Sequence, residues 1–380
     1  MDRSGVRTCV HPNKIERTRQ MEELKKTREE IEKIDKEMRR LFEMRMSAVE
    51  KVADYKKEHG LPIKDEEREE YLIRKNSELL DKKEVGDYYV LFQKKLMELS
   101  CAYQRKRNSG MKIAYCGVEG AFAWIAANKM FPGADLVTCD SFEQAYSAVE
   151  NGEADSAVLP IENSYAGEVV NVMDLMFSGN LYVNSVIDVD IVHNLIAPEG
   201  ATIDGIKKVV SHTQALTQCD EFIKAHGFEK MAYNNTAMAA EYVKKLNDPT
   251  VAAIASKETA EIHGLQVLAS GINASRSNTT RFASFSGSRN VPGGDVKTRA
   301  DHFILVFTVK NEAGALAQTL NIIGAHNFNM RSLRSRPMKG LMWNYYFYIE
   351  ADGNINTRDG SDMLNELGAL CANLKLVGTY

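Results

Sequence analysis

The chain has 380 residues, more than a single hydrophobic core usually organises, so we expect two or three domains. Hydrophobic residues make up 44% and charged residues 26%, and the net charge is -4. This composition indicates a folded, water-soluble protein and gives no reason to expect a nucleic-acid or membrane partner. The six cysteines are scattered without a C-x-x-C pair, and no apolar run approaches the ~20 residues that a membrane span needs. We therefore expect a cytoplasmic protein without disulfides or structural zinc, and nothing in the sequence indicates a cofactor.

The first part of the chain is predicted to be helical. Residues 15–59 contain neither proline nor glycine, which predicts one helix about 66 Å long at 1.5 Å per residue. Gly60 ends it. A second helix is expected over residues 65–82, with Asp65 as its N-cap, and a third over residues 87–107. Because so long a helix cannot bury its apolar stripe within a three-helix unit, we expect an all-helical homodimer or a higher homo-oligomer.

Two basic residues lie on the apolar stripe of the first helix. At ~100° per residue the stripe comprises Leu24, Ile31, Ile34, Met38, Phe42, Val49 and Val52. Arg45 and Lys56 fall within about 20° of its centre, and Arg28 lies about 80° off, at its edge. Basic side chains on a buried stripe are costly unless an anion meets them, which indicates a pocket for a di-anion. The alternative explanation is pairing with Glu of the same chain, or extension of the long side chains into solvent.

Residues 15–107 resemble the all-helical chorismate mutases. The matching run is Arg28, Arg45, Lys56, Asp65, Arg68, Glu69, Ser100 and Gln104. The resemblance implies a site that binds the two carboxylates of chorismate through arginines, with Arg28 supplied by the partner subunit. It also implies that Lys56 and Gln104 hydrogen-bond the ether oxygen as charge develops in the pericyclic rearrangement to prephenate. A Gln rather than a Glu at position 104 needs no unusual protonation at neutral pH.

From residue 111 onward, short β-rich runs alternate with helical runs, which predicts an α/β fold with parallel sheets. Two sets of such units suggest two lobes that flank a ligand cleft. The expected strands are at 112–115, 136–138, 156–159, 181–189, 208–211, 231–233 and 251–255, and the expected helices at 121–130, 142–150, 168–177, 214–225 and 237–246.

Several loops that follow these strands carry polar groups. They are Gly117-Val-Glu-Gly-Ala-Phe122, Pro160-Ile-Glu-Asn-Ser164 with Gly167, and Ser211-His-Thr-Gln-Ala-Leu216 with Gln218 and Cys219. Each alone is explained by ordinary capping or turn chemistry. Together with Asn278-Thr-Thr-Arg-Phe282 and with His193 and Leu195, they resemble the prephenate dehydratases.

This second resemblance implies a two-lobed fold like that of periplasmic binding proteins, and a set of site residues. Thr280 would donate a proton to the leaving hydroxide and Arg281 would bind a substrate carboxylate. Asn163, Ser211 and Gln218 would orient prephenate. The reaction is the combined loss of water and carbon dioxide, which yields phenylpyruvate. A positioned hydrogen bond describes the threonine better than full proton transfer, because a hydroxyl is a poor acid.

The glycine loop departs from the family pattern. Ala121 and Ala123 stand where hydroxyl residues are usual, and Thr213 stands where proline is usual. The loss of these hydroxyls would weaken ligand contacts unless backbone donors replace them.

The end of the chain is predicted to be a separate small module. Residues 286–299 are expected to be a linker. Strands at 302–309, 329–336, 343–350 and 374–378 and helices at 314–325 and 360–372 follow the order βαββαβ of an α+β ferredoxin-like fold.

This segment resembles the small amino-acid-binding (ACT) module attached to these enzymes. The resemblance implies feedback inhibition by phenylalanine through Gly314, Ala315, Leu316, Ser335, Arg336 and Pro337. The second family element is normally E-S-R-P, and here Arg334 replaces the glutamate with the opposite charge.

The sequence therefore predicts three domains: an all-α chorismate mutase at 15–107, a two-lobed α/β prephenate dehydratase at 111–286 and a regulatory domain at 300–380. Such an enzyme converts chorismate to prephenate and prephenate to phenylpyruvate, in the biosynthesis of phenylalanine. Two alternatives stay open. The α/β part could be a non-catalytic ligand-sensing module, or it could act on arogenate and yield phenylalanine directly.

Overall fold

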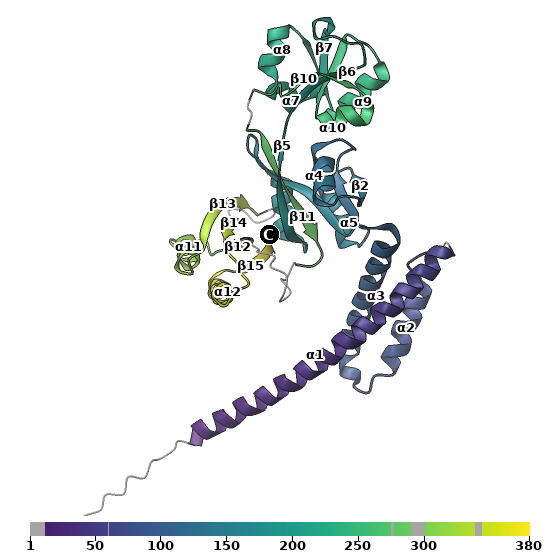
Figure 1. The fold of residues 1–380 in the computed structure, drawn as a ribbon. Helices are drawn as coiled ribbons and strands as arrows, with labels where there is room; N and C mark the ends of the chain where they lie inside the picture. Colours follow the sequence, from purple (N-terminus) through teal and green to yellow (C-terminus); the bar gives the residue numbers. More distant parts are fainter. Residues whose placement is uncertain (1–11, 60, 275–276, 290–300, 339–343) are drawn as a thin grey trace, which may run out of the picture. The chain divides into compact units, whose positions relative to one another are not determined.

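The computed structural model describes residues 12–59, 61–274, 277–289, 301–338 and 344–380. It divides into two compact units, Met1–Asn108 and Ser109–Tyr380, each treated by itself below (Figure 1). Most of the expected linker at 286–299, and the first residue of the strand expected at 343–350, lie outside the described residues. Within the described part of the chain, no helix has the length and apolar character to cross a membrane.

The first unit is built of helices, as predicted. α1 spans Pro12–Glu58, α2 Glu66–Glu78 and α3 Gly86–Ser109, with a short 3-10 turn, η1, at Lys83–Val85. The 47 residues of α1 make it about 70 Å long at 1.5 Å per residue. Asp65 is the N-cap of α2, because its carboxylate accepts a hydrogen bond from the backbone N–H of Arg68 at 3.1 Å.

The second helix is shorter than predicted, since it ends at Glu78 and not at Lys82. The next two backbone N–H groups bond carbonyls three residues back, which tightens the chain into a 3-10 turn. The Nζ of Lys83 donates to the Glu78 carbonyl at 3.0 Å and so satisfies one of the carbonyls left open at the helix end.

The helical unit buries few side chains by itself. In its described part the buried residues are Ala53, Met97, Ser100, Cys101 and Gln104. The predicted stripe of α1 is largely exposed: apart from the half-buried Val49, its residues range from 42% for Phe42 to 59% for Ile34. Figure 1 shows why: α2 and α3 lie beside the C-terminal half of α1, and its N-terminal half extends beyond them.

In the second unit, ten strands of the described residues form one sheet in the order β13-β14-β12-β15-β5-β11-β3-β1-β2, with β4 paired to β3. The first α/β lobe supplies six of these strands and three helices. They are β1 Lys112–Cys116, β2 Asp135–Cys139, β3 Ser156–Asn163, β4 Gly167–Glu168, β5 Tyr182–Asp190, β11 Thr279–Ser286, α4 Phe122–Met130, α5 Phe142–Glu150 and α6 Val170–Ser178.

The second lobe has its own sheet, in the order β10-β6-β9-β7-β8. The two-lobed α/β prediction is therefore confirmed, and the chain crosses between the lobes after β5 and again before β11. The elements of the second lobe are β6 Asn194–Ala197, η2 Ile203–Gly205, β7 Lys208–His212, α7 Thr213–Gln218, α8 Asp220–His226, β8 Glu229–Tyr233, α9 Thr236–Leu246, β9 Val251–Ala255, α10 Lys257–His263 and β10 Gln266–Ala269.

The expectation of parallel sheets is only partly correct. β1 pairs in parallel with β2 and β3, and β7 with β8 and β9. The strands next to the two crossings (β5, β11, β6 and β10) run antiparallel to neighbours within their lobes. Of these, β6, β10 and β11 were not predicted, nor was α10.

The single helix expected at 214–225 is broken into α7 and α8 at Cys219. The break coincides with a hydrogen bond from outside the helix, because the Gln218 carbonyl accepts from the backbone N–H of Ala274 at 2.9 Å.

The described residues from 302 to 380 follow the predicted βαββαβ order. The elements are β12 His302–Thr308, α11 Ala315–Ala325, β13 Asn329–Pro337, β14 Tyr345–Asp352, α12 Arg358–Leu370 and β15 Asn373–Thr379. We call this segment the C-terminal module.

The C-terminal module and the first lobe share one sheet and one core. β15 pairs in parallel with β5, where Gly378 lies opposite Val183. A Cβ on Gly378 would lie 1.9 Å from the Val183 carbonyl oxygen, so only glycine fits this joint. Side chains of the module, among them Ile304, Tyr346 and Val377, belong to the same buried cluster as those of the first lobe.

Candidate active sites

Seven of the eight predicted mutase residues line one pocket of about 190 Å³ in the helical unit. They come from three elements and their flanking turn: Arg45 and Lys56 from α1, Asp65, Arg68 and Glu69 from the start of α2, and Ser100 and Gln104 from α3. The structure thus brings together positions that are up to 59 residues apart in the sequence, counted from Arg45 to Gln104.

The cationic side chains of this pocket are held by short contacts. Arg45 donates to the hydroxyl of Ser100, which in turn donates to the Leu96 carbonyl at 2.7 Å. Burial lowers the pKa of Arg45, although it leaves the guanidinium charged at neutral pH. Lys56 donates to the Ile63 carbonyl at 2.6 Å. The site therefore holds fixed positive charge next to neutral hydrogen-bonding groups.

Gln104 is the polar side chain with the clearest unmet bonding capacity in this pocket. It is only 6% exposed, and its Oε1 has no hydrogen-bond partner among the described residues. A buried amide oxygen without a partner is costly, which favours a ligand group that donates to it.

Arg28 is not part of this pocket. It lies 17 residues before Arg45 on the same straight helix, about 25 Å away along the axis at 1.5 Å per residue. Its side chain is exposed, and residue 28 belongs to the N-terminal half of α1. Arg28 therefore cannot complete the pocket of its own chain.

In the second unit, three predicted residues meet in a buried hydrogen-bond network. The Nδ2 of Asn163 donates to Thr280 Oγ1 at 2.8 Å and to Asn278 Oδ1 at 2.9 Å. The Nδ2 of Asn278 donates to Gln218 Oε1 at 3.0 Å, and His193 Nε2 lies 2.8 Å from that same oxygen. The network joins β3, β11 and the segment after β5 to α7 of the second lobe, and thus links the two lobes.

The protonation of His193 follows from its partner. Since the Gln218 oxygen can only accept, His193 carries its proton on Nε2, and its buried Nδ1 has no partner among the described residues. Burial lowers the pKa of His193, so the ring stays neutral at physiological pH. The ring of Phe122 meets it edge-on at 5.9 Å.

Thr280 is 8% exposed and accepts a hydrogen bond from Asn163, but its own O–H donates to no described residue. Donation by the amide withdraws electron density from the oxygen and strengthens the hydroxyl as a donor. The geometry therefore presents a buried, oriented O–H group.

Ser211 and Arg281 lie outside the network. The hydroxyl of Ser211 is fully buried and donates to the Ile254 carbonyl at 2.6 Å. Arg281 follows Thr280 in β11, and because successive strand residues point to opposite faces, it faces the C-terminal module instead. There it donates to both oxygens of Glu350, at 2.8 and 2.9 Å.

Asn278 and His193 belong to the network although they were not named as site residues. The sequence did hold a signal for both, since each stands within a matched family motif.

The glycine loop forms a contact between the lobes. Gly120 has φ of +83°, and its carbonyl accepts from Thr259 Oγ1 of α10 at 2.8 Å. A Cβ here would come within 3.0 Å of that hydroxyl. Ala121 begins α4 without a side-chain cap, so the hydroxyl missing from the family pattern is not replaced by another side chain there.

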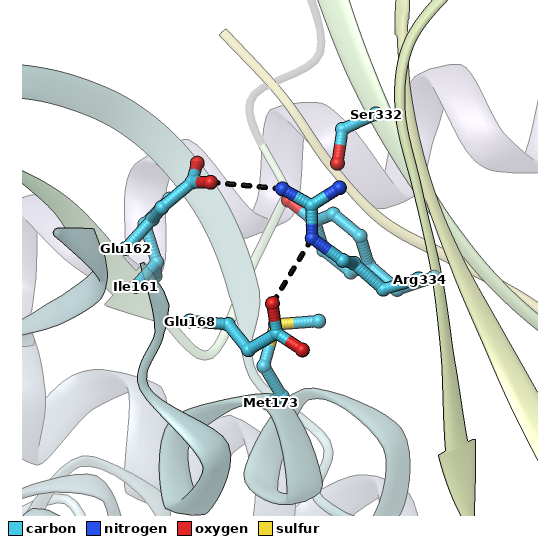
Figure 2. A pocket seen from close by; sticks show the side chains of 7 residues that line it. Ile161, Glu162, Glu168, Met173, Ser332 and Arg334 are labelled. Atoms are coloured by element: carbon cyan, nitrogen blue, oxygen red, sulfur yellow. Dashed lines mark hydrogen bonds and ion pairs between the residues drawn. The ribbon is translucent and has the colours of Figure 1, made fainter. Parts of the chain in front are cut away.

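A second polar cluster lies where the C-terminal module meets the first lobe. Nη1 of Arg281 also lies 3.4 Å from Glu162 Oε2, and its Nη2 donates to the Tyr380 hydroxyl at 3.1 Å. The hydrogen bonds that Arg281 donates to Glu350 raise the pKa of Arg281 above its ordinary value. Figure 2 shows the neighbouring pocket, where Arg334 lies between Glu162 and Glu168.

The residues expected to bind an effector lie on two elements of the module. Gly314, with φ of +85°, is the N-cap of α11, and Ala315 and Leu316 form its first turn. Ser335, Arg336 and Pro337 end β13, the edge strand of the sheet. Arg336 lies 3.7 Å from Asp174 of α6, and its Nε is buried without a hydrogen-bond partner in the described structure.

Comparison with known proteins assigns both units. Residues 27–105 match the family of type II chorismate mutases, and residues 113–290 match the prephenate dehydratase family. A bifunctional chorismate mutase/prephenate dehydratase of Buchnera aphidicola is 31% identical over 370 residues, which cover 93% of this chain and 95% of the relative.

Two solved structures resemble the second unit. A prephenate dehydratase from Arthrobacter aurescens, in complex with L-Phe, is 29% identical with a TM-score of 0.64, covering 71% of this chain and 90% of that one. A protein described as a quorum-quenching acylase, GqqA, is 28% identical with the same TM-score of 0.64, covering 71% and 97%. Since the match to the Buchnera enzyme spans both units in the same order, the chain belongs to the bifunctional chorismate mutase/prephenate dehydratases.

Proposed function

We propose that the seven-residue pocket of the helical unit rearranges chorismate to prephenate, and that the network around Thr280 converts prephenate to phenylpyruvate. The two reactions are consecutive steps toward phenylalanine. The observation that carries the proposal is the convergence of Arg45, Lys56 and Gln104 on one pocket, since fixed positive charge beside a buried side-chain amide suits a di-anion with an ether oxygen.

The mutase reaction needs no nucleophile and no acid–base pair. Arg45 and Arg68 bind carboxylates and hold the reactive conformer, which removes much of the entropic barrier. Lys56 and Gln104 then donate to the ether oxygen as its bond to carbon breaks and negative charge develops there.

The dehydratase reaction is driven by aromatisation. The ring carboxylate leaves as carbon dioxide, the electron pair of that carbon–carbon bond enters the ring, and the ring C–O bond breaks. Thr280 donates a hydrogen bond to the departing hydroxide, while Asn163 and Gln218 fix the geometry around it. Ser211 shapes the second lobe, whereas Arg281 faces the C-terminal module and pairs with Glu350, so we assign it no substrate contact.

Two variants test the assignment in the full-length chain. Gln104→Ala is expected to reduce mutase kcat/KM by about 100- to 1,000-fold and to spare phenylpyruvate formation. Thr280→Ala is expected to do the reverse. Loss of both activities from a folded single variant would rule out two independent sites.

The same assay decides between the alternatives for the α/β unit. Purified protein is supplied with prephenate or with arogenate, and phenylpyruvate and phenylalanine are quantified. Product from neither substrate would indicate a sensing module. The test is worthwhile because the second unit also resembles GqqA, a protein described as a quorum-quenching acylase. Faster turnover of arogenate would identify it as the substrate.

We also propose that the helical unit works as a homodimer in which Arg28 enters the partner's pocket. The exposed stripe of α1 and the distance of Arg28 from its own pocket support this arrangement. Complementation tests it. Arg28→Ala and Gln104→Ala chains are each expected to lose most mutase activity, but mixed dimers contain one pocket with both wild-type residues. Mixing after subunit exchange should therefore restore mutase activity, and failure to restore it would refute a shared site.

The C-terminal module is proposed to be an ACT regulatory domain that binds phenylalanine, as the relative from Arthrobacter does. The open N-terminus of α11 supports a carboxylate contact. Titration of phenylalanine should lower dehydratase activity and raise the thermal midpoint. An unchanged rate and midpoint at millimolar phenylalanine would refute regulation at this module.

A further inference from the structure

Arg334 lies at the contact between the C-terminal module and the first lobe. It stands on β13, where the resembled family motif carries a glutamate. Its Nη2 donates to Glu162 Oε1 at 2.9 Å and its Nε to Glu168 Oε2 at 3.1 Å. All three side chains are only about one-third exposed, at 33% for Arg334, 31% for Glu162 and 33% for Glu168. Figure 2 shows the guanidinium between the two carboxylates.

The two glutamates are direct cross-strand partners. In the antiparallel pair of β3 and β4, Glu162 faces Glu168 and Asn163 faces Gly167. Like charges directly opposite each other destabilise a strand pair. A guanidinium that donates to both carboxylates removes this repulsion, and so closes the base of the loop between the strands.

That loop determines the position of Asn163. Its Oδ1 accepts from the backbone N–H groups of Tyr165 at 3.0 Å and of Ala166 at 2.8 Å, while its Nδ2 reaches Thr280 at 2.8 Å. Glu162 and Asn163 are successive strand residues, so one faces the module and the other faces Thr280. A displacement at Glu162 therefore moves the amide that orients the hydroxyl.

Arg281 cannot take over this role. Its guanidinium lies 3.4 Å from the Glu162 carboxylate, and both of its terminal nitrogens already donate to Glu350, at 2.8 and 2.9 Å. Among the described residues, Glu168 forms its ion pair with Arg334.

We propose that Arg334 is a positioning residue for the dehydratase reaction: by bridging Glu162 and Glu168 it closes the β3–β4 loop and holds Asn163 against Thr280. This inference rests on the proposed dehydratase function of the Thr280 network. It makes the C-terminal module a structural part of the dehydratase site.

The test uses the full-length chain with prephenate as substrate. Arg334→Ala is expected to lower kcat by about 10- to 100-fold, because small displacements of positioned groups have effects of that size. KM should change less than about twofold, since the substrate contacts remain. Arg334→Lys keeps the charge but lacks the planar fork, so its kcat should fall between those of the wild type and the alanine variant.

A second substitution gives an outcome that general destabilisation would not produce. Glu168→Gln removes one of the two opposed charges at nearly constant volume. In the Arg334→Ala background it should raise kcat by about threefold or more, because it relieves the repulsion that Arg334 no longer offsets. Unchanged kcat in Arg334→Ala, or a further loss in the double variant, overturns the proposal.

Arg358→Ala is the matched control. Arg358 belongs to the same module, is 97% exposed and pairs with Asp362 of its own helix. Its removal deletes the same charge without touching the first lobe, and both activities should stay at the wild-type level. Circular dichroism checks that each variant folds. If Arg334→Ala does not fold, Glu168→Gln is measured alone. It leaves the Arg334–Glu162 bond in place and removes the opposed charge, so kcat should stay above about half of the wild-type value, and a larger loss would overturn the proposal. Absence of phenylpyruvate from the wild-type chain would refute the proposed function and this inference with it, whereas wild-type turnover with an unchanged kcat in Arg334→Ala would refute the inference alone.

Discussion

Gln104 is buried beside cationic side chains, and its amide can donate without any change of protonation. A glutamate there could donate only in its protonated form. Gln104→Glu should therefore lower mutase kcat/KM at pH 7.5 by at least about tenfold and make the rate rise as the pH falls. The measurement is the pH–rate profile of prephenate formation between pH 5 and 9. A flat profile for this variant would show that donation by residue 104 is not needed.

Glu350 provides a prediction for stability. Burial opposes its ionisation, but hydrogen bonds from Arg281 and Tyr380 outweigh this and lower its pKa below the ordinary 4.5. A lowered folded-state pKa adds stability above the unfolded pKa, and this stability is lost as the pH falls through the folded value. The difference in thermal midpoint between wild type and Glu350→Gln should therefore be largest near pH 7 and shrink below about pH 4.5. A difference that does not change with pH would contradict this pairing.

At the scale of the element, the joint between β15 and β5 depends on Gly378. Gly378→Ala should destabilise the second unit by about 1–3 kcal/mol, because the Cβ would meet the Val183 carbonyl at 1.9 Å. Gly368→Ala is the control, since no heavy atom lies within 4 Å of the added Cβ in α12 and alanine favours a helix. Thermal unfolding should show a lower midpoint for the first variant and an equal or higher one for the second.

The helices could be read from the sequence better than the strands. α1 has a long uninterrupted pattern without Gly or Pro, and Asp65 is a local cap, so both follow from neighbouring residues. β11 holds Thr280 and Arg281, but its pairing with β3 joins residues about 120 positions apart, such as Arg281 and Glu162. No local pattern carries that information.

The candidate sites show the same division. The mutase positions could be predicted because the α1 stripe and the spacing of Ser100 and Gln104 follow helical periodicity. For the dehydratase, the motifs located Asn163, Gln218 and Thr280. They did not predict that Arg281 faces the C-terminal module, because that requires β11 to be recognised as a strand. Nor could they predict the partners of Arg334, which lie 166 and 172 residues away.

At the scale of the whole molecule, the two units differ in how much core each contains. The second unit holds several large buried clusters, whereas the helical unit leaves most of its α1 stripe exposed. Calorimetry should therefore resolve two transitions, and the helical one should shift to higher temperature as protein concentration rises, as expected for subunit association. Ile34→Lys, on the stripe, should lower that transition alone. A helical transition independent of concentration would argue against association through α1.

The facing pair of Glu162 and Glu168 also limits how this protein can change over evolutionary time. With Arg334 between them, no one of the three charges can be reversed without leaving two like charges in contact. Because the family motif usually carries glutamate at position 334, the arginine is expected to have been acquired before positions 162 and 168 were both acidic. Substitutions at the three positions are therefore expected to be coupled, with their order deciding which intermediates remain active.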